Sequence, residues 1–246
     1  MATTREPIRA TAAYSGFIAD QIRTSQFFLY VINLSVQADN AYKALKDIIQ
    51  ETSGDERVRQ ELTGMEDKAG AADVLMGYQR LMTELSLCRA VDSYLIYLSD
   101  LLALIFATRP DTLKSSETVR LDMVLEYKNM DDLVAALAEA RVNSLSYKGM
   151  RNLSKYLSER LGFRLFSDSE AENCAIEIVE LRNLIVHNRG VVNRIVASRL
   201  PSLSAGIGKP VPLDPAKVFS DLIFLIHSAR DIDGRAADKF DLPLSS

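Results

Sequence analysis

Residues 74–108, VLMGYQRLMTELSLCRAVDSYLIYLSDLLALIFAT, contain the strongest periodic pattern in the chain. From Val74 to Ile105, apolar side chains recur every three or four residues, which is the spacing of one face of an α-helix. The pattern stops at Thr108, two residues before Pro110, because proline disfavours the helical conformation of its predecessor. The stretch predicts one long helix with an apolar face that other helices must cover.

Shorter segments repeat the same periodicity. Helical spacing predicts further helices over 11–34, 38–49, 130–145 and 148–161, one beginning near 167, and a last one carrying 218–226. Residues 27–32 are nearly all apolar and are expected to be buried. Ser167 and Glu170 match a capping box, with Ser167 as the N-cap. With only 11 glycines and 7 prolines in 246 residues, turn residues are too few for an all-β fold. The sequence predicts an all-α fold, a helical bundle with an N-terminal helical extension.

A polar stretch at 52–70, TSGDERVRQELTGMEDKAG, interrupts the helical pattern and predicts a mobile connection or a short exposed helix. We therefore expect residues 1–70 to form the extension, packed on the core, and 71–246 to form the main helical domain. Residues 200–215 hold four prolines and two glycines, which predicts a loop or strap on the surface.

Composition limits the class of protein. The net charge is −4, and the longest uninterrupted apolar run is 101–107, too short to span a membrane. No secretory signal is visible, so Cys88 and Cys174 are expected to be reduced thiols in a cytoplasmic protein. Phosphate-binding glycine motifs and metal-ligand spacings are absent from the sequence, so neither a cofactor nor a metal is predicted.

The charge is unevenly distributed. Residues 181–213 contain five cations and no acid, so the remainder of the chain sums to −9. A solvated face is one interpretation of this stretch, and a local anion-binding surface is the other. The stretch begins at Arg182-Asn183-Leu184-Ile185-Val186-His187-Asn188-Arg189-Gly190, near the end of a predicted amphipathic helix.

This motif resembles the signature of the HEPN superfamily (higher eukaryotes and prokaryotes nucleotide-binding): Arg, then Asn, Asp or His, then a few residues, then His. The similarity is sharp over 180–194, extends loosely through 146–166, and says nothing specific about 1–70. The resemblance implies an α-helical domain that dimerises with its motif helices facing each other. Many such homodimers are metal-independent endoribonucleases, some with a protein antitoxin or regulator, while others are inactive interaction or nucleotide-binding modules.

The residue types suit RNA cleavage without a metal. His187 can move a proton near neutral pH, and Arg182 can stabilise the charge that develops on the phosphate. Five residues apart on a helix, these two side chains point roughly 140° apart, so two copies must share a cleft before they converge. Asn183 lies four residues before His187 on the same face and would position the pair. Residues predicted to bind the flanking substrate are Asn188, Arg189 and Arg194.

One supporting residue is expected upstream. Asp92 lies at the edge of the apolar stripe of the long helix, where a partly buried carboxylate needs a partner. In this superfamily a polar group from an upstream helix often supports the motif, which suggests a contact between Asp92 and Arg182.

Structural alternatives remain for each residue. Arg182 can pair with Glu177 or Glu180 instead, and His187 can fill a helix contact. Arg189 and Gly190 can simply end the helix, and His227 is expected in the core or at its edge. Three hypotheses follow: a dimeric ribonuclease, a non-catalytic dimer that binds RNA, nucleotides or proteins, and a structural monomer with a chance motif.

Overall fold

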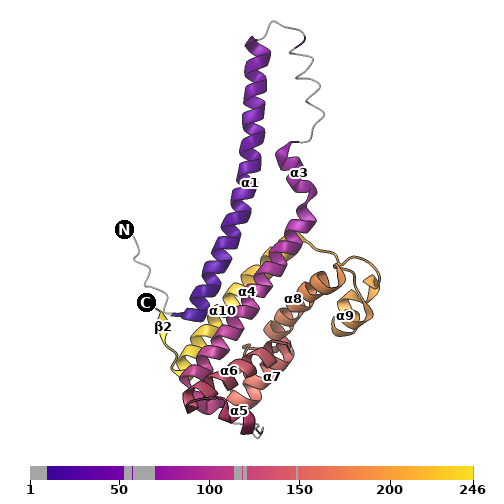
Figure 1. Cartoon of the computed structure of the whole chain (residues 1–246). Coiled ribbons are helices and arrows are strands. Elements are labelled where there is room, and N and C mark those ends of the chain that lie inside the picture. Colours follow the sequence, from indigo (N-terminus) through magenta and orange to yellow (C-terminus); the bar gives the residue numbers. More distant parts are fainter. Residues whose placement is uncertain are drawn as a thin grey trace. The chain divides into compact units, whose positions relative to one another are not determined.

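The computed structural model describes residues 10–52, 57, 70–113, 118, 121–147 and 149–245 (Figure 1). The sequence-predicted connection at 52–70 therefore lies almost wholly outside the described residues. The helices are α1 (Ala12–Thr52), α3 (Ala71–Gly77), α4 (Gln79–Thr108), α5 (Leu121–Leu125), α6 (Met130–Tyr147), α7 (Met150–Leu161), α8 (Ser169–Asn188), α9 (Arg194–Arg199) and α10 (Pro215–Phe240). Short 3-10 helices η1 (Pro110–Leu113) and η2 (Pro201–Gly206) and the two-residue strands β1 (Ala10–Thr11) and β2 (Leu244–Ser245) complete them. The all-α prediction is confirmed.

The described residues divide into two compact units. Residues 10–21 and 87–245 form unit 1, and the described part of Ile22–Ser86 forms unit 2. The boundary predicted at residue 70 does not coincide with this division. The reason is that α1 and α4 each contribute residues to both units, so the division crosses two helices instead of a loop.

Unit 1 has a core built on α4 and α10. Tyr94 and Tyr97 of α4 are fully buried, and their hydroxyl groups reach Ser228 and the carbonyl of Ala229 on α10, each at 3.0 Å. Helices α6, α7 and α8 pack in sequence beside them. The predicted end of α4 at Thr108 is confirmed.

The start of the described chain is tied to the end of α10. The buried carboxylate of Asp233 accepts hydrogen bonds from the backbone N–H of Thr11 at 2.9 Å and from its hydroxyl at 2.6 Å. β1 pairs antiparallel with β2, joining Ala10 to Ser245. These contacts hold both ends of the described chain against the core of unit 1.

Unit 2 is a hairpin of α1, α3 and the start of α4. The carboxylate of Asp39 accepts hydrogen bonds from the backbone N–H groups of Ala71 (2.6 Å) and Ala72 (2.8 Å), which fixes the start of α3 against α1. The two helices predicted over 11–34 and 38–49 are one continuous helix, because no glycine or proline interrupts residues 35–37.

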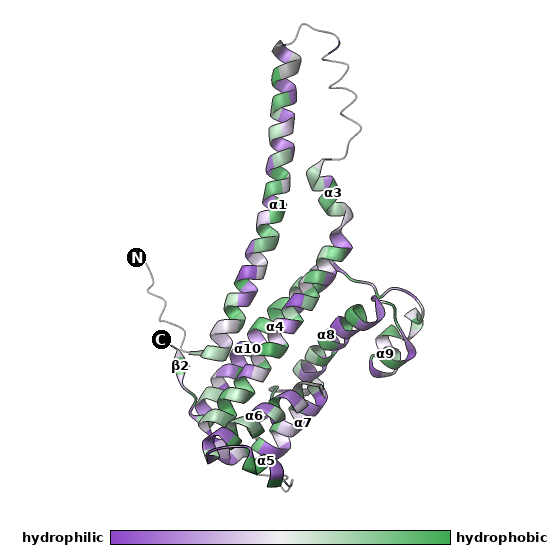
Figure 2. Ribbon diagram, viewed as in Figure 1, coloured by the Kyte–Doolittle hydropathy of each residue, from purple (hydrophilic) through white to green (hydrophobic). Residues whose placement is uncertain are grey.

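The predicted burial of residues 27–32 is wrong. Phe27, Leu29 and Tyr30 are more than half exposed, and the hydrophobic residues along α1 and α3 are visible in Figure 2. In a two-helix hairpin each helix can cover only one side of its neighbour, so an apolar sequence on several sides of α1 stays in solvent.

Among the described helices, α4 is long and apolar enough to cross a membrane by length and composition alone. However, 56% of its most apolar window is buried inside the protein, and core helices of this kind pass the same test.

Candidate functional site

The site is built on α8, which carries the Arg-Asn-x-x-x-His motif. Its N-cap is Asp168 and not Ser167 as predicted. Asp168 has the extended backbone of an N-cap and accepts a hydrogen bond from the N–H of Ala171 at 2.8 Å, whereas Ser167 donates its hydroxyl to Asp168. These hydrogen bonds, first that from Ala171, lower the pKa of Asp168. Aspartate caps a helix as well as serine does, and its negative charge also interacts favourably with the positive end of the helix dipole.

Arg182 is held from two sides. Its Nη2 lies 2.6 Å from Oδ1 of Asp92 on α4, and its Nη1 donates to Oδ1 of Asn183 at 3.1 Å. Its Nε is buried and has no hydrogen-bond partner among the described residues. The side chain is 21% exposed, against 38% for Asp92. The predicted Asp92–Arg182 contact is therefore present, and it fixes the guanidinium at the surface of unit 1.

Neither alternative partner, Glu177 or Glu180, forms an ion pair with Arg182 in the described part of the chain. Glu180 pairs with Arg199 of α9, with 3.0 Å between Nη1 and Oε1. The contact with Asp92 thus replaces both alternatives.

His187 lies one turn beyond Asn183 and is exposed. Within the described residues its imidazole has no hydrogen-bond partner, so it does not fill a helix contact in the single chain. His227 is likewise exposed, on α10, so the alternative of a core position for it is wrong. Because α8 is continuous from Ser169 to Asn188, Arg182 and His187 lie about 7.5 Å apart along its axis and point about 140° apart. One chain does not bring them together.

The end of α8 is a left-handed turn. Arg189 (φ 54°) and Gly190 (φ 71°) both adopt the left-handed conformation, and Asn188 donates its side-chain amide to the carbonyl of Val191. The helix-terminus interpretation of Arg189 and Gly190 therefore holds. Asn188, predicted to bind substrate, has its amide engaged inside this turn.

The predicted strap covers the end of α8. The N–H of Val192 donates to the carbonyl of Lys209, and the N–H of Val211 donates to that of Gly190. A small cluster of apolar side chains lies beneath the strap: Leu184, Val192, Val196, Ala197, Leu200 and Val211. The strap therefore keeps residues 189–211 close to the motif.

Three cations of the acid-free stretch are exposed there. Arg189, Arg194 and Lys209 have no ion-pair partner among the described residues, whereas Arg182 and Arg199 are paired. An acid-free segment folded around one helix end concentrates positive charge locally, although the whole chain is acidic. This surface can bind phosphate groups beside His187.

A cleft of about 400 Å³, which we call the α7–α8 cleft, opens beside the motif. Asn183 lines it from α8, and Arg151 and Asn152 line it from the start of α7, opposite the Arg199–Glu180 pair. Sequence reasoning missed Arg151 and Asn152, since no spacing links the first turn of α7 to residues 30 positions later. Asn183 therefore lines a cavity whose volume is within the range of small-ligand sites.

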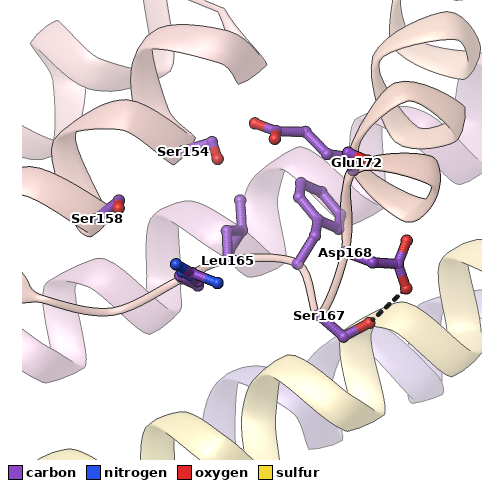
Figure 3. Close-up of a pocket in the computed structure, with 9 residues that line it drawn as sticks. Ser154, Ser158, Leu165, Ser167, Asp168 and Glu172 are labelled. Carbon is purple, nitrogen blue, oxygen red and sulfur yellow. Dashed lines mark hydrogen bonds between the residues drawn. The ribbon is translucent and has the colours of Figure 1, made fainter.

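A second cavity, of about 220 Å³, lies at the opposite end of α8 (Figure 3). Ser154 and Ser158 of α7 face it, together with Asp168 and Glu172 of α8. The positive end of the helix already has Asp168, Glu170 and Glu172 beside it, so an anion would meet carboxylates there. This cavity is separated from the motif by most of α8 and is not part of the candidate site.

Cys174 is not activated as a nucleophile. Burial and the charge of nearby Asp221 raise the pKa of Cys174, which keeps its thiol protonated. Asp221 is buried and accepts a hydrogen bond from Lys217 on the same helix. Partial burial lowers the pKa of Lys217, but the carboxylate of Asp221 outweighs this and the pKa is raised. Among the described residues, no cluster of histidine, cysteine, aspartate or glutamate could hold a metal ion.

Comparisons of the chain with protein-family models, with curated proteins and with solved structures find no match. The geometry of α8 and its surroundings is therefore the basis for a functional assignment.

Proposed function

We propose that the chain is a metal-independent endoribonuclease of HEPN type, active as a homodimer that pairs two copies of α8. One observation carries the proposal. Arg182 is fixed by Asp92 and Asn183, while His187, five residues further along the same helix, is exposed and has no hydrogen-bond partner among the described residues. A fixed cation and an available proton carrier are the two groups that cleavage of RNA by its own 2′-hydroxyl requires.

The two-fold arrangement follows from the angle between the side chains. Because Arg182 and His187 of one copy diverge by about 140°, each site would combine groups from both copies across the symmetry axis. The exposed Val186 lies between them in sequence and offers apolar surface to the pairing. Arg189, Arg194 and Lys209 would hold the phosphates on either side of the cleaved bond.

In the reaction, His187 would accept the proton of the 2′-hydroxyl as that oxygen attacks the adjacent phosphorus. Arg182 would stabilise the additional negative charge on the phosphate oxygens, and Asn183 would orient the substrate from the α7–α8 cleft. The bond to the 5′-oxygen breaks, that oxygen takes up a proton from water, and the proton held by His187 is released to solvent. The products carry a 2′,3′-cyclic phosphate and a 5′-hydroxyl.

A non-catalytic RNA-binding or protein-interaction dimer is the second candidate. Its support is that the charge of Arg182 is already balanced by Asp92 within one chain. A guanidinium engaged in this way stabilises the fold and is less available to a reacting phosphate.

Incubation of purified protein with RNA in excess EDTA separates these candidates. We expect cleavage with 2′,3′-cyclic phosphate ends, and a loss of at least 100-fold in the His187→Ala variant, the usual size of a general acid–base contribution. His227→Ala, which changes the only other histidine and is also at an exposed position, is the matched control and should keep wild-type activity.

Loss of activity in EDTA, or full activity of His187→Ala, contradicts the ribonuclease proposal. RNA binding by wild-type protein without cleavage supports the second candidate.

A further inference from the structure

Unit 2 presents an apolar surface that no described residue covers. Eight large side chains form what we call the hairpin face, each between 49 and 66% exposed: Phe27, Tyr30, Leu34 and Leu45 on α1, and Val74, Tyr78, Leu81 and Leu85 on α3 and α4.

These eight residues lie on one side of the hairpin. On α1 the less exposed positions Thr24, Phe28 and Val31 face the neighbouring helix, and the α1 members of the hairpin face follow a line about 90° away from them. On α3, Val74 lies about 100° from Leu75, and on α4, Leu81 lies about 100° from Met82, both in the same sense as on α1. Since the two helices are antiparallel, equal rotations bring both lines to the same side.

The size of the hairpin face matches a stable interface. Eight half-exposed aromatic and aliphatic side chains offer on the order of 700 Å² of mostly apolar surface, close to what each partner buries in a standard protein interface. An exposed apolar area of this size exceeds the apolar patches that isolated soluble proteins usually expose.

The segments of the chain outside the described residues are poorly suited to cover this face. Residues 53–69 carry eight charged side chains, and residues 1–9 carry three and a proline. Burying such segments on an apolar surface would desolvate their charges. An apolar surface on another molecule is therefore a better occupant than either of these charged segments.

The chemistry of the hairpin favours a protein over a lipid surface. Residues 22–86 contain seven basic and ten acidic side chains, a net charge of −3, whereas helices that lie on membranes carry basic polar faces. The face itself consists of aliphatic and aromatic groups spread over two antiparallel helices. The surface that complements it best is another pair of helices with the same composition, as in a four-helix bundle.

We propose that the hairpin face binds the hairpin face of a second copy of this chain through two-fold symmetry. A two-fold contact is self-complementary, so one apolar face is sufficient to supply both sides of the interface. This interface is separate from the pairing of α8 in the proposed function and does not depend on ribonuclease activity.

The test measures self-association of the full-length protein by sedimentation velocity over about 1–100 μM, the range in which interfaces of moderate affinity dissociate. Leu34→Glu and, separately, Leu81→Glu should each raise the dissociation constant at least tenfold. Leu29→Glu is the matched control: Leu29 is on the same helix and is 66% exposed, but it points to another side of α1, so association should be unchanged. Circular dichroism checks that every variant keeps its helix content.

Val186→Glu, placed on α8, distinguishes the two interfaces. If association is lost in Val186→Glu and unchanged in Leu34→Glu, copies pair through α8 alone and the hairpin proposal is overturned. It is also overturned if the wild type is monomeric throughout the concentration range, or if Leu29→Glu acts as strongly as Leu34→Glu. Flotation of the wild type with phosphatidylcholine–phosphatidylglycerol vesicles, abolished by Leu34→Glu, would assign the face to lipid and overturn it as well.

Discussion

At Arg182 the guanidinium divides its donors between Asp92, on another helix, and Asn183, the next residue. Hydrogen bonds in which both partners are charged are stronger than neutral ones, but both side chains keep some contact with water, which screens the pair. The pair therefore contributes modestly to stability, and its larger effect is to fix the orientation of the guanidinium.

A double-mutant cycle measures this contact. We expect Asp92→Ala and Arg182→Ala to show a coupling free energy of about 1 kcal/mol in urea unfolding, within the range for contacting residues. The cycle of Arg182→Ala with Glu177→Ala, residues on one helix that form no ion pair, should give a value near zero. Strictly additive effects of Asp92→Ala and Arg182→Ala would contradict the contact.

The pKa shifts of Asp233 and Asp168 predict opposite effects of pH on the stability of the fold. Burial raises the pKa of Asp233, although the hydrogen bonds from Thr11 oppose the shift. Its folded pKa is therefore above the unfolded value, so its contribution to stability is present at low pH and is lost as the pH rises through the folded pKa. The pKa of Asp168 is lowered, so its contribution is present above the unfolded pKa and is lost as the pH falls.

Denaturant unfolding at about pH 7 and about pH 4 tests both signs. Relative to Asp233→Asn, the wild type should gain stability as the pH is lowered. Relative to Asp168→Asn, it should lose stability over the same interval. Differences that change in the same direction for the two variants would contradict this assignment.

Helix α8 combines a capped start with a left-handed end. Asp168 caps its first turn, and its last turn leads into two consecutive left-handed residues. Gly190 adopts this conformation without a steric penalty, whereas Arg189 has a Cβ that disfavours it. Arginine is an unfavourable residue in this conformation, which suggests that its side chain has a use other than stability.

Arg189→Gly tests that interpretation. It should raise the free energy of unfolding by about 0.5–1 kcal/mol through relief of the left-handed conformation, while weakening RNA binding. Arg189→Ala is the matched control, since it removes the same charge but keeps a Cβ, so binding should weaken without a gain in stability. A destabilised Arg189→Gly variant would contradict the strain argument, and unchanged RNA binding would contradict the proposed role.

Over the whole molecule, a net charge of −4 is combined with a cationic surface at one helix end. Long-range repulsion of RNA by the acidic body and short-range attraction at this surface both weaken with salt. The three exposed cations Arg189, Arg194 and Lys209, which form no ion pair within the described residues, would set the contacts with phosphate.

Fluorescence anisotropy can measure how strongly the His187→Ala variant binds single-stranded RNA at different salt concentrations. The salt dependence reports how many cations contact phosphate. The logarithm of the association constant should fall with the logarithm of salt concentration with a slope of about −2 for the three cations of each protomer. Arg194→Glu should reduce the slope by about 0.7 or more. Lys155→Glu, a charge change on α7 outside this surface, is the control, and an equal effect there would contradict a localised site.

The sequence determined the helical class, the end of α4 at Thr108 and the helix that carries the motif, because these depend on local periodicity and on proline. It misplaced the cap of α8 by one residue, since serine and aspartate are both good caps.

Only the tertiary structure decided which apolar residues are buried and which cations are paired. The sequence of 27–32 is as hydrophobic as a core segment, yet it is exposed because only one neighbouring hairpin helix covers it. Likewise, Arg182 has acids nearby in its own helix, yet it contacts Asp92, 90 positions away. Burial and pairing depend on which elements meet in space, and local sequence does not encode that.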